Sequence, residues 1–177
     1  MILAHGLNGE IGKGNGLLWD IRKDLDLFKQ KTIGDIVLMG KNTYDSIPFK
    51  DGFPERENWI LSSTMSNEDC GENVHVLRTV NEAGLLMRDL QKDGYTGTIW
   101  IVGGASIYRQ FESIVDEIHV TEVLHNFPKA DTFYKPSLLG MVKESEQDVS
   151  SNVYHAVHKV YVRAQKKMFS KYELSKR

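Results

Sequence analysis

Two aspartates on one predicted helix differ in their surroundings, and one of them is a candidate acid. The helix is predicted for residues 20–32. On its wheel, Asp24 lies on the apolar side beside Phe28, whereas Asp26 lies among lysines and arginines. A carboxylate on an apolar face costs free energy unless it has partners or takes up a proton. Asp24 can therefore supply charge or a proton to a reaction, although an aspartate that only holds a structural hydrogen bond would show the same pattern.

Two junctions between a buried strand and a helix have the composition of a phosphate-binding turn. They read VLMGKNT, around Gly40, and IWIVGGASIY, around Gly103 and Gly104. Glycine lets the backbone approach a ligand closely, and the free N–H groups of a helix N-terminus attract anions. Singly, each glycine is more typical of an ordinary turn, but the pair predicts a dinucleotide site at the carboxyl ends of parallel strands. Neither junction matches the Rossmann or Walker pattern.

The segment that precedes the first helix, GLNGEIGKGNGLLW, has five glycines within eleven residues. This composition predicts no stable element there, and we interpret the segment as a mobile lid that ends at Trp19. An ordinary flexible connector would have the same composition.

The hydrophobic pattern predicts the elements that position these groups. Strands are predicted for residues 1–6, 35–39, 58–62, 74–77, 98–102 and 118–123, and helices for residues 20–32 with Asp20 as N-cap, 41–47, 80–92 and 105–111. Nearly continuous apolar strands separated by helices predict an α/β fold, a mostly parallel central sheet flanked by helices on both faces. Alternating patterns over residues 142–148 and 154–164 predict a closing C-terminal antiparallel hairpin. We therefore expect one catalytic domain over residues 1–164 and a basic tail over residues 165–177.

Composition and charge exclude several classes of protein. Of the 177 residues, 41% are hydrophobic and 26% are charged, with a net charge of -2, which excludes a disordered chain. The segment from Lys159 onward carries a net charge of +6 and the preceding residues a net charge of -8. The body thus offers no broad basic face, and we expect no nucleic-acid partner. A solvated tail or a short helical extension is the favoured interpretation of the basic end.

Other features argue against a secreted, membrane or metal-binding protein. The single cysteine, Cys70, lies in the polar stretch SNEDCGEN and is interpreted as a loop thiol. No run of eighteen apolar residues is present, and the first residues are too quickly polar for a signal peptide. His155 and His158 are three apart on a predicted strand and face opposite sides, so we expect no metal. These features predict a cytoplasmic protein that binds no membrane.

Six short motifs occur in an order and spacing that are specific together, although each is weak alone. They are IGKGNGLLWD, DLDLFK, VLMGKNTYDSI, FPERENWILSS, IWIVGGASIY, and IHVTEV followed by ADTFY. Together they make residues 2–164 resemble the bacterial-type dihydrofolate reductases. The resemblance implies an NADPH-dependent reductase that converts dihydrofolate to tetrahydrofolate for one-carbon metabolism and that binds antifolates. We expect a monomer, although the sequence does not give the oligomeric state.

Carried over position by position, the resemblance implies a role for each matching residue. The implied catalytic residues are Asp24, which holds the pterin and promotes protonation of its C=N bond, Thr121, which hydrogen-bonds that carboxylate, Trp19 and Tyr108. The implied substrate-binding residues are Ile2, Ala4, Leu25, Phe28, Ile47, Phe53, Arg56, which grips the glutamate carboxylate, and Val102. The implied cofactor-binding residues are Ala4, Ile11, Gly12, Leu17, Gly40, Lys41, Asn42, Thr43, Leu61, Ser62, Ser63, Thr64, Val102, Gly103, Gly104, Ala105, Ser106, Ile107 and Tyr108. Asp131 matches a loop position that steadies the lid.

The sequence also departs from the family pattern. Leu18 stands where a proline commonly precedes the lid tryptophan, and His5 stands where an apolar residue is usual. Two other interpretations remain at this stage. A pyrimidine reductase of riboflavin synthesis would share the glycine junctions but would not require Asp24, Phe28 and Arg56 together. A binding protein could keep the nucleotide site without catalysis.

Overall fold

The computed structural model describes residues 1–164, and the predicted basic tail lies outside the described residues. The chain groups into two compact units. The first contains Met1–Leu25 and the chain from Phe111 onward, and the second contains Asp26–Gln110. A single catalytic domain over residues 1–164 stays a prediction.

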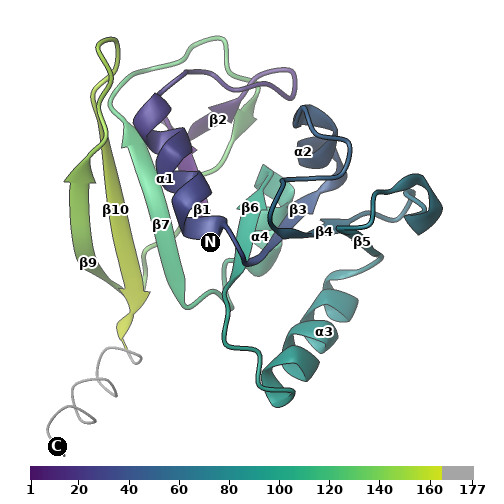
Figure 1. Cartoon of the computed structure of the whole chain (residues 1–177). Helices are drawn as coiled ribbons and strands as arrows, with labels where there is room; N and C mark the ends of the chain where they lie inside the picture. Colours follow the sequence, from purple (N-terminus) through teal and green to yellow (C-terminus); the bar gives the residue numbers. More distant parts are fainter. Residues whose placement is uncertain (165–177) are drawn as a thin grey trace, which may run out of the picture. The chain divides into compact units, whose positions relative to one another are not determined.

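The first unit is built on a four-stranded sheet with the order β1-β7-β10-β9 (Figure 1). β1 is parallel to β7, whereas β10 is antiparallel to both β7 and β9, which confirms the predicted closing hairpin. A second, two-stranded sheet pairs β2 with β8. The strands are β1 (Ile2–His5), β2 (Glu10–Gly12), β7 (Glu117–Val123), β8 (Thr132–Phe133), β9 (Met141–Asp148) and β10 (Ala156–Arg163).

The second unit is built on a fully parallel sheet with the order β5-β4-β3-β6. Its elements are β3 (Ile36–Gly40), α2 (Lys41–Ser46), β4 (Glu57–Leu61), the 3-10 helix η1 (Asn67–Asp69), β5 (Val74–Leu77), α3 (Val80–Lys92), β6 (Ile99–Gly103) and α4 (Ala105–Phe111). The residues Ile36–Met39 of β3 are at most 2% exposed. Such burial on both faces explains why this strand is a continuous apolar run rather than an alternating one.

Helix α1 (Arg22–Thr32) carries the candidate acid and begins two residues later than predicted. The prediction of Asp20 as its N-cap is wrong, because the carbonyl of Ile21 accepts the first backbone hydrogen bonds, from the N–H groups of Asp24 and Leu25. The side chain of Ile21 is 1% exposed. A buried apolar residue, rather than Asp20, therefore lies directly before the first turn of the helix.

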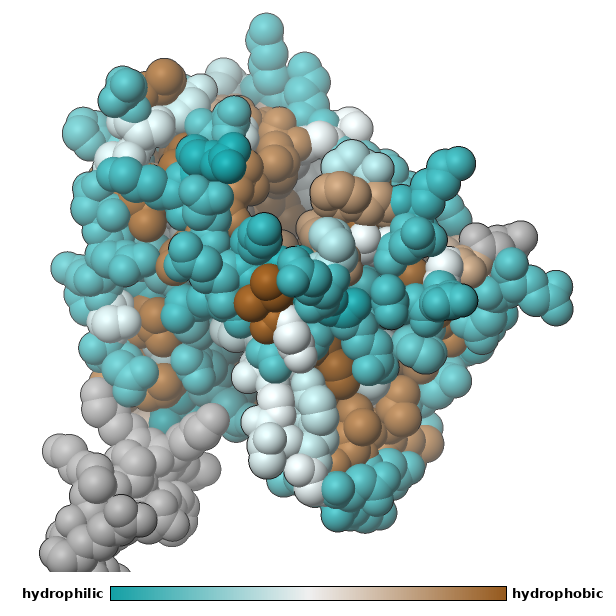
Figure 2. All heavy atoms as spheres, in the orientation of Figure 1, coloured by the Kyte–Doolittle hydropathy of each residue, from teal (hydrophilic) through white to brown (hydrophobic). Residues whose placement is uncertain are grey.

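Polar side chains cover most of the face shown in Figure 2, as a composition with 26% charged residues leads one to expect. No helix among residues 1–164 is long and apolar enough to cross a membrane.

Candidate active site

Asp24 and Thr121 form a hydrogen-bonded pair in the first unit. The Thr121 hydroxyl on β7 is buried and donates to Oδ1 of Asp24, in the first turn of α1, at 2.5 Å. Burial raises the pKa of the Asp24 carboxyl, and the bond from Thr121 offsets part of that rise. Asp26 is exposed, as the helical wheel predicts. The carboxyl of Asp24 is therefore placed to exchange a proton nearer neutral pH than an ordinary aspartate.

The strand beside β7 supplies two of the residues predicted to bind substrate. Ala4 is the register partner of Thr121 in the parallel pair of β1 and β7, and Ile2 pairs with His119. Ile2 is buried and Ala4 is half-buried. Leu25, one residue after Asp24, is 42% exposed. An apolar side chain so exposed beside a carboxyl group is available for contact with a ligand.

The glycine-rich segment contains a short strand where none was predicted. β2 pairs with β8, and the Glu10 carboxylate is buried and accepts hydrogen bonds from the backbone of Asn8 and Phe127. The expectation that the segment forms no stable element is therefore wrong for Glu10–Gly12. The reason is long-range pairing, which local composition does not show.

The tip of the same segment is held by an aspartate from a distant loop. The backbone N–H of Gly14 donates to Oδ2 of Asp131 at 2.8 Å. The ring of Trp19 lies 4.9 Å from that of Phe127, and Leu17 is 71% exposed. Ile11 and Gly12 lie on β2. The predicted steadying contact from Asp131 to the segment is thus present in the structure.

Arg56, in the second unit, is buried and hydrogen-bonded to uncharged oxygens. Its Nε donates to Oγ1 of Thr32 at 2.8 Å, Nη1 to the carbonyl of Pro54 at 2.6 Å, and Nη2 to the carbonyl of Lys29 at 3.2 Å. Its guanidinium also lies 5.5 Å from the centroid of the Phe53 ring. Among the described residues, no carboxylate forms an ion pair with the guanidinium of Arg56, and its side chain is buried rather than paired with a charge on the surface.

Three of the five guanidinium N–H groups of Arg56 are used by these bonds. One N–H is left on each terminal nitrogen, which is the number that the two oxygens of a carboxylate accept. The rings of Phe28 and Phe53 lie 5.3 Å apart beside this group, and Ile47 is half-buried at the C-cap of α2. The arrangement can bind a molecule with an aromatic part and a carboxylate.

Asn58 holds the loop that presents Phe53 and Arg56. Its side chain is fully buried, and its Oδ1 accepts from the backbone N–H of Phe53 at 2.8 Å. Its Nδ2 donates to the carbonyls of Phe53 and Arg56. The strand pattern places Asn58 in a buried position, where an amide needs partners, so a signal for this residue exists in the sequence.

The predicted cofactor residues of the second unit lie along one edge of its parallel sheet. Gly40 ends β3, Leu61 ends β4 as its register partner, and Gly103 ends β6 on the other side of β3. The helices that follow β3 and β6 begin at Lys41 and Ala105. Residues from three separate segments are therefore brought to one edge: Asn42 and Thr43 in α2, Ser62, Ser63 and Thr64 after β4, and Val102, Gly104, Ser106, Ile107 and Tyr108 around β6 and α4.

Packing at the glycines of this edge is tight, so an added side chain would require a neighbouring side chain to shift. A Cβ on Gly40 would lie 3.1 Å from Ile107, and a Cβ on Gly103 would lie 3.0 Å from the hydroxyl of Tyr108. Gly103 also has a φ of +115°, which side-chain-bearing residues rarely adopt. Because these positions carry no side chain, a ligand can approach the backbone closely. The residues at this edge therefore fit a dinucleotide.

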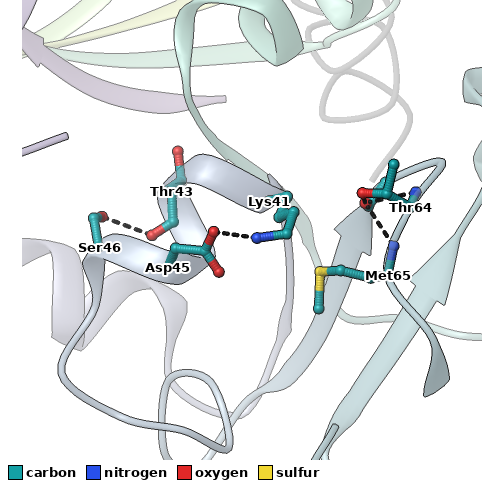
Figure 3. Close-up of polar contacts among 7 residues, drawn as sticks. Lys41, Thr43, Asp45, Ser46, Thr64 and Met65 are labelled. Atoms are coloured by element: carbon teal, nitrogen blue, oxygen red, sulfur yellow. Dashed lines mark hydrogen bonds and ion pairs between the residues drawn. The ribbon is translucent and has the colours of Figure 1, made fainter. Parts of the chain in front are cut away.

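Two cationic side chains, Lys41 and Arg78, lie on the same edge, and only Lys41 was expected from the sequence. Lys41 forms an ion pair with Asp45 within α2, and the loop with Thr64 and Met65 lies across from it (Figure 3). Arg78, which follows β5, donates from Nη1 to the carbonyl of Ser62 at 3.3 Å. A basic residue directly after a strand of this sheet is a signal that could have identified Arg78.

Comparison with known proteins identifies the family. The family described as "Dihydrofolate reductase" matches residues 1–163. The chain belongs to the dihydrofolate reductase family. It is 33% identical over 149 residues to dihydrofolate reductase type 8 of Escherichia coli, which covers 83% of this chain and 85% of that protein. It is also 33% identical over 162 residues to a putative dihydrofolate reductase of Caenorhabditis elegans, with 85% of both chains covered.

A solved structure agrees with this assignment to the dihydrofolate reductases. The structure is dihydrofolate reductase from Enterococcus faecalis, complexed with NADP(H) and RAB-propyl, with a TM-score of 0.76 and 25% identity. The match covers 92% of this chain and 94% of that one. The predictions of the fold, of the family and of an NADPH-dependent dihydrofolate reductase are confirmed. The individual roles of the site residues stay predictions.

Proposed function

We propose that this dihydrofolate reductase uses the Asp24–Thr121 pair to bind and activate the pterin. The observation that carries the proposal is the carboxyl of Asp24, half-buried, hydrogen-bonded to a buried hydroxyl and raised in pKa. A carboxylate can accept two parallel hydrogen bonds from the amino group and ring nitrogen of a pterin. Its negative charge then favours the cationic, protonated form of the C=N bond that receives the hydride.

The reaction needs one hydride and one proton. When bound, NADPH supplies the hydride, which forms the new C–H bond at the carbon of the C=N bond, and the nitrogen takes the proton. The chain's own residues offer contacts to the substrate from each unit. In the first unit, Ile2, Ala4 and Leu25 offer apolar contact to a flat ring. In the second unit, Phe28 and Phe53 offer apolar contact to a ring, and Arg56 offers its two remaining N–H groups to the glutamate carboxylate.

A comparison of substrates tests the proposed function against its nearest alternative. Purified protein with NADPH should reduce dihydrofolate and leave the aminopyrimidine intermediate of riboflavin synthesis untouched. Reduction of the pyrimidine instead would show that the proposed substrate is wrong. Failure to oxidise NADPH with either substrate, while NADPH still binds, would favour a non-catalytic nucleotide-binding protein.

We predict a preference for NADPH over NADH that Lys41→Glu weakens. The edge that carries Lys41 also carries Arg78 and the hydroxyls of Ser63 and Thr64. Two carboxylates near these cations already have partners, because Asp45 pairs with Lys41 and Glu82 accepts a hydrogen bond from the backbone N–H of Arg78. Lys41 is 43% exposed, so solvent screens part of the effect. We expect the KM for NADPH to rise by roughly tenfold.

The control for this cofactor test is Lys92→Glu, which makes the same charge change at an exposed position on α3. It should leave the KM for NADPH unchanged, and the KM for NADH should change little in either variant. Equal efficiency of the two cofactors in the unaltered enzyme would contradict the prediction.

We predict that Asp131→Ala slows turnover because the segment that contains Gly14 loses its anchor. The Gly14 N–H lowers the pKa of the Asp131 carboxyl, so Asp131 is ionised and accepts this bond throughout the neutral range. Loss of one such bond should reduce kcat by roughly two- to tenfold. Asp131→Asn keeps an oxygen acceptor and should recover part of the loss. Steady-state kinetics of both variants checks the prediction, and equal kcat for Asp131→Ala and the unaltered enzyme would contradict it.

We also propose that the protein is a cytoplasmic monomer that acts on small molecules without a nucleic-acid or membrane partner. The net negative charge of the body and the single cysteine support this proposal. Size-exclusion chromatography with light scattering tests the oligomeric state, and a dimer would contradict it.

A further inference from the structure

His158 extends the Asp24–Thr121 pair by one more buried residue. Its Nδ1 lies 3.0 Å from Oγ1 of Thr121, and the two residues are register partners in the antiparallel pair of β7 and β10. His158 is 3% exposed. The three side chains thus form a hydrogen-bonded row from α1 across β7 to β10.

The single hydrogen of the Thr121 hydroxyl makes this row directional. An ionised Asp24 only accepts hydrogen bonds, so Thr121 must donate to it. The Thr121 oxygen is then an acceptor toward His158, which must carry a hydrogen on Nδ1. The structure therefore assigns a protonation state to Nδ1 of His158 whenever Asp24 is charged.

We propose that His158 is a positioning residue for dihydrofolate reduction: it holds the Thr121 hydroxyl toward Asp24 and stabilises the ionised carboxylate. The inference rests on the proposed role of Asp24. Hydrogen bonds in a chain polarise one another, so donation from His158 strengthens donation from Thr121. From the sequence, His158 was considered only as a metal ligand, and no role in the reaction was expected for it.

Other groups lie beside His158 on the neighbouring strands. His119, on β7 two residues before Thr121, has its ring centroid 5.6 Å from that of His158. The Nε2 of His119 lies 2.8 Å from Oε1 of Glu117. From β9, the register partner of His158 is Gln147, which carries no charge.

Replacement of His158 by phenylalanine keeps a ring and removes the donor to Thr121. We expect the pKa of Asp24 to rise further in His158→Phe, because the ionised form loses support. We expect kcat/KM for dihydrofolate to fall by roughly three- to tenfold, with NADPH binding unchanged. His158→Asn places an amide N–H near the position of Nδ1. It should partly restore the pKa of Asp24 and the kcat/KM for dihydrofolate.

The pKa is measured directly by NMR on the full chain with isotope-labelled aspartate, with the Asp24 signal assigned through Asp24→Asn. His5→Phe is the matched control, because His5 is as buried as His158 but lies with its Nδ1 on the carbonyl of Gly6 rather than on Thr121. It should leave the pKa of Asp24 unchanged. If His158→Phe does not fold, His158→Leu is expected to give the same shift.

An unchanged Asp24 pKa in a folded variant without the His158 donor would overturn the proposal, as would an equal shift in the His5→Phe control. The NMR titration needs no substrate. The proposed function is tested by a separate measurement: if it is wrong, the unaltered enzyme does not reduce dihydrofolate.

Discussion

Asp24→Asn should lower turnover at neutral pH by roughly a hundredfold or more. The variant keeps the shape of the side chain and an oxygen that accepts from Thr121, but it removes the charge that favours a protonated C=N bond. Turnover should partly recover as the pH falls, because solvent then supplies the proton. The measurement is kcat for dihydrofolate across the acid and neutral range, and unaltered turnover at neutral pH would remove Asp24 from the mechanism.

Stability provides the control for this variant. Burial raises the pKa of Asp24, so the folded protein binds this proton more tightly than the unfolded chain does. The stability that this group contributes is present at low pH and is lost as the pH rises through its folded pKa. At neutral pH the charged carboxylate therefore opposes folding, and Asp24→Asn should have a Tm no lower than the unaltered enzyme. If Asp24→Asn has a lower Tm than the unaltered enzyme at neutral pH, its lost activity is due to misfolding rather than to the lost charge.

Arg56→Leu should weaken dihydrofolate binding by roughly 2–3 kcal/mol, or about 30- to 150-fold. The guanidinium is fixed by Thr32, Pro54 and Lys29 and has no carboxylate partner of its own among the described residues. Its loss would leave the glutamate carboxylate of the substrate unpaired. NADPH binding should barely change.

A substrate without the glutamate isolates the contact of Arg56. A dihydropterin that lacks the glutamate should be used about equally well by Arg56→Leu and by the unaltered enzyme, and the two enzymes with two substrates form a double cycle. Arg88→Leu removes an exposed arginine on α3 and should affect neither substrate. If Arg56→Leu loses the same factor on both substrates, Arg56 only shapes the loop that carries Phe53.

The fold was most predictable where local chemistry marks both ends of an element. Helix α3 has its predicted bounds because Thr79 caps it by accepting from the N–H of Glu82, and Gly94 follows it with a φ of +84°. β2 and β8 were missed because strands of three and two residues carry too little pattern. They are defined by a pairing between Glu10 and Phe133, far apart in the chain.

The same distinction separates the predicted from the missed parts of the site. Asp24 is visible in the sequence because one helix shows its asymmetry locally, and Thr121 and Arg56 follow from the family resemblance. His158 and Arg78 were missed because their importance depends on which residue lies opposite or beside them in a sheet. That register is fixed by tertiary packing and cannot be obtained from spacing along the chain.

Transfer of isotope from NADPH tests the central claim most directly. NADPH that carries deuterium in the transferable position is mixed with dihydrofolate and the purified full-length chain, and the folate product is analysed by mass spectrometry. We predict tetrahydrofolate with one deuterium on the carbon of the former C=N bond, one equivalent of NADP formed for each product, and a rate lowered at least a hundredfold in Asp24→Asn. Oxidation of NADPH without deuterium in tetrahydrofolate, or no oxidation by the folded protein, would contradict the account.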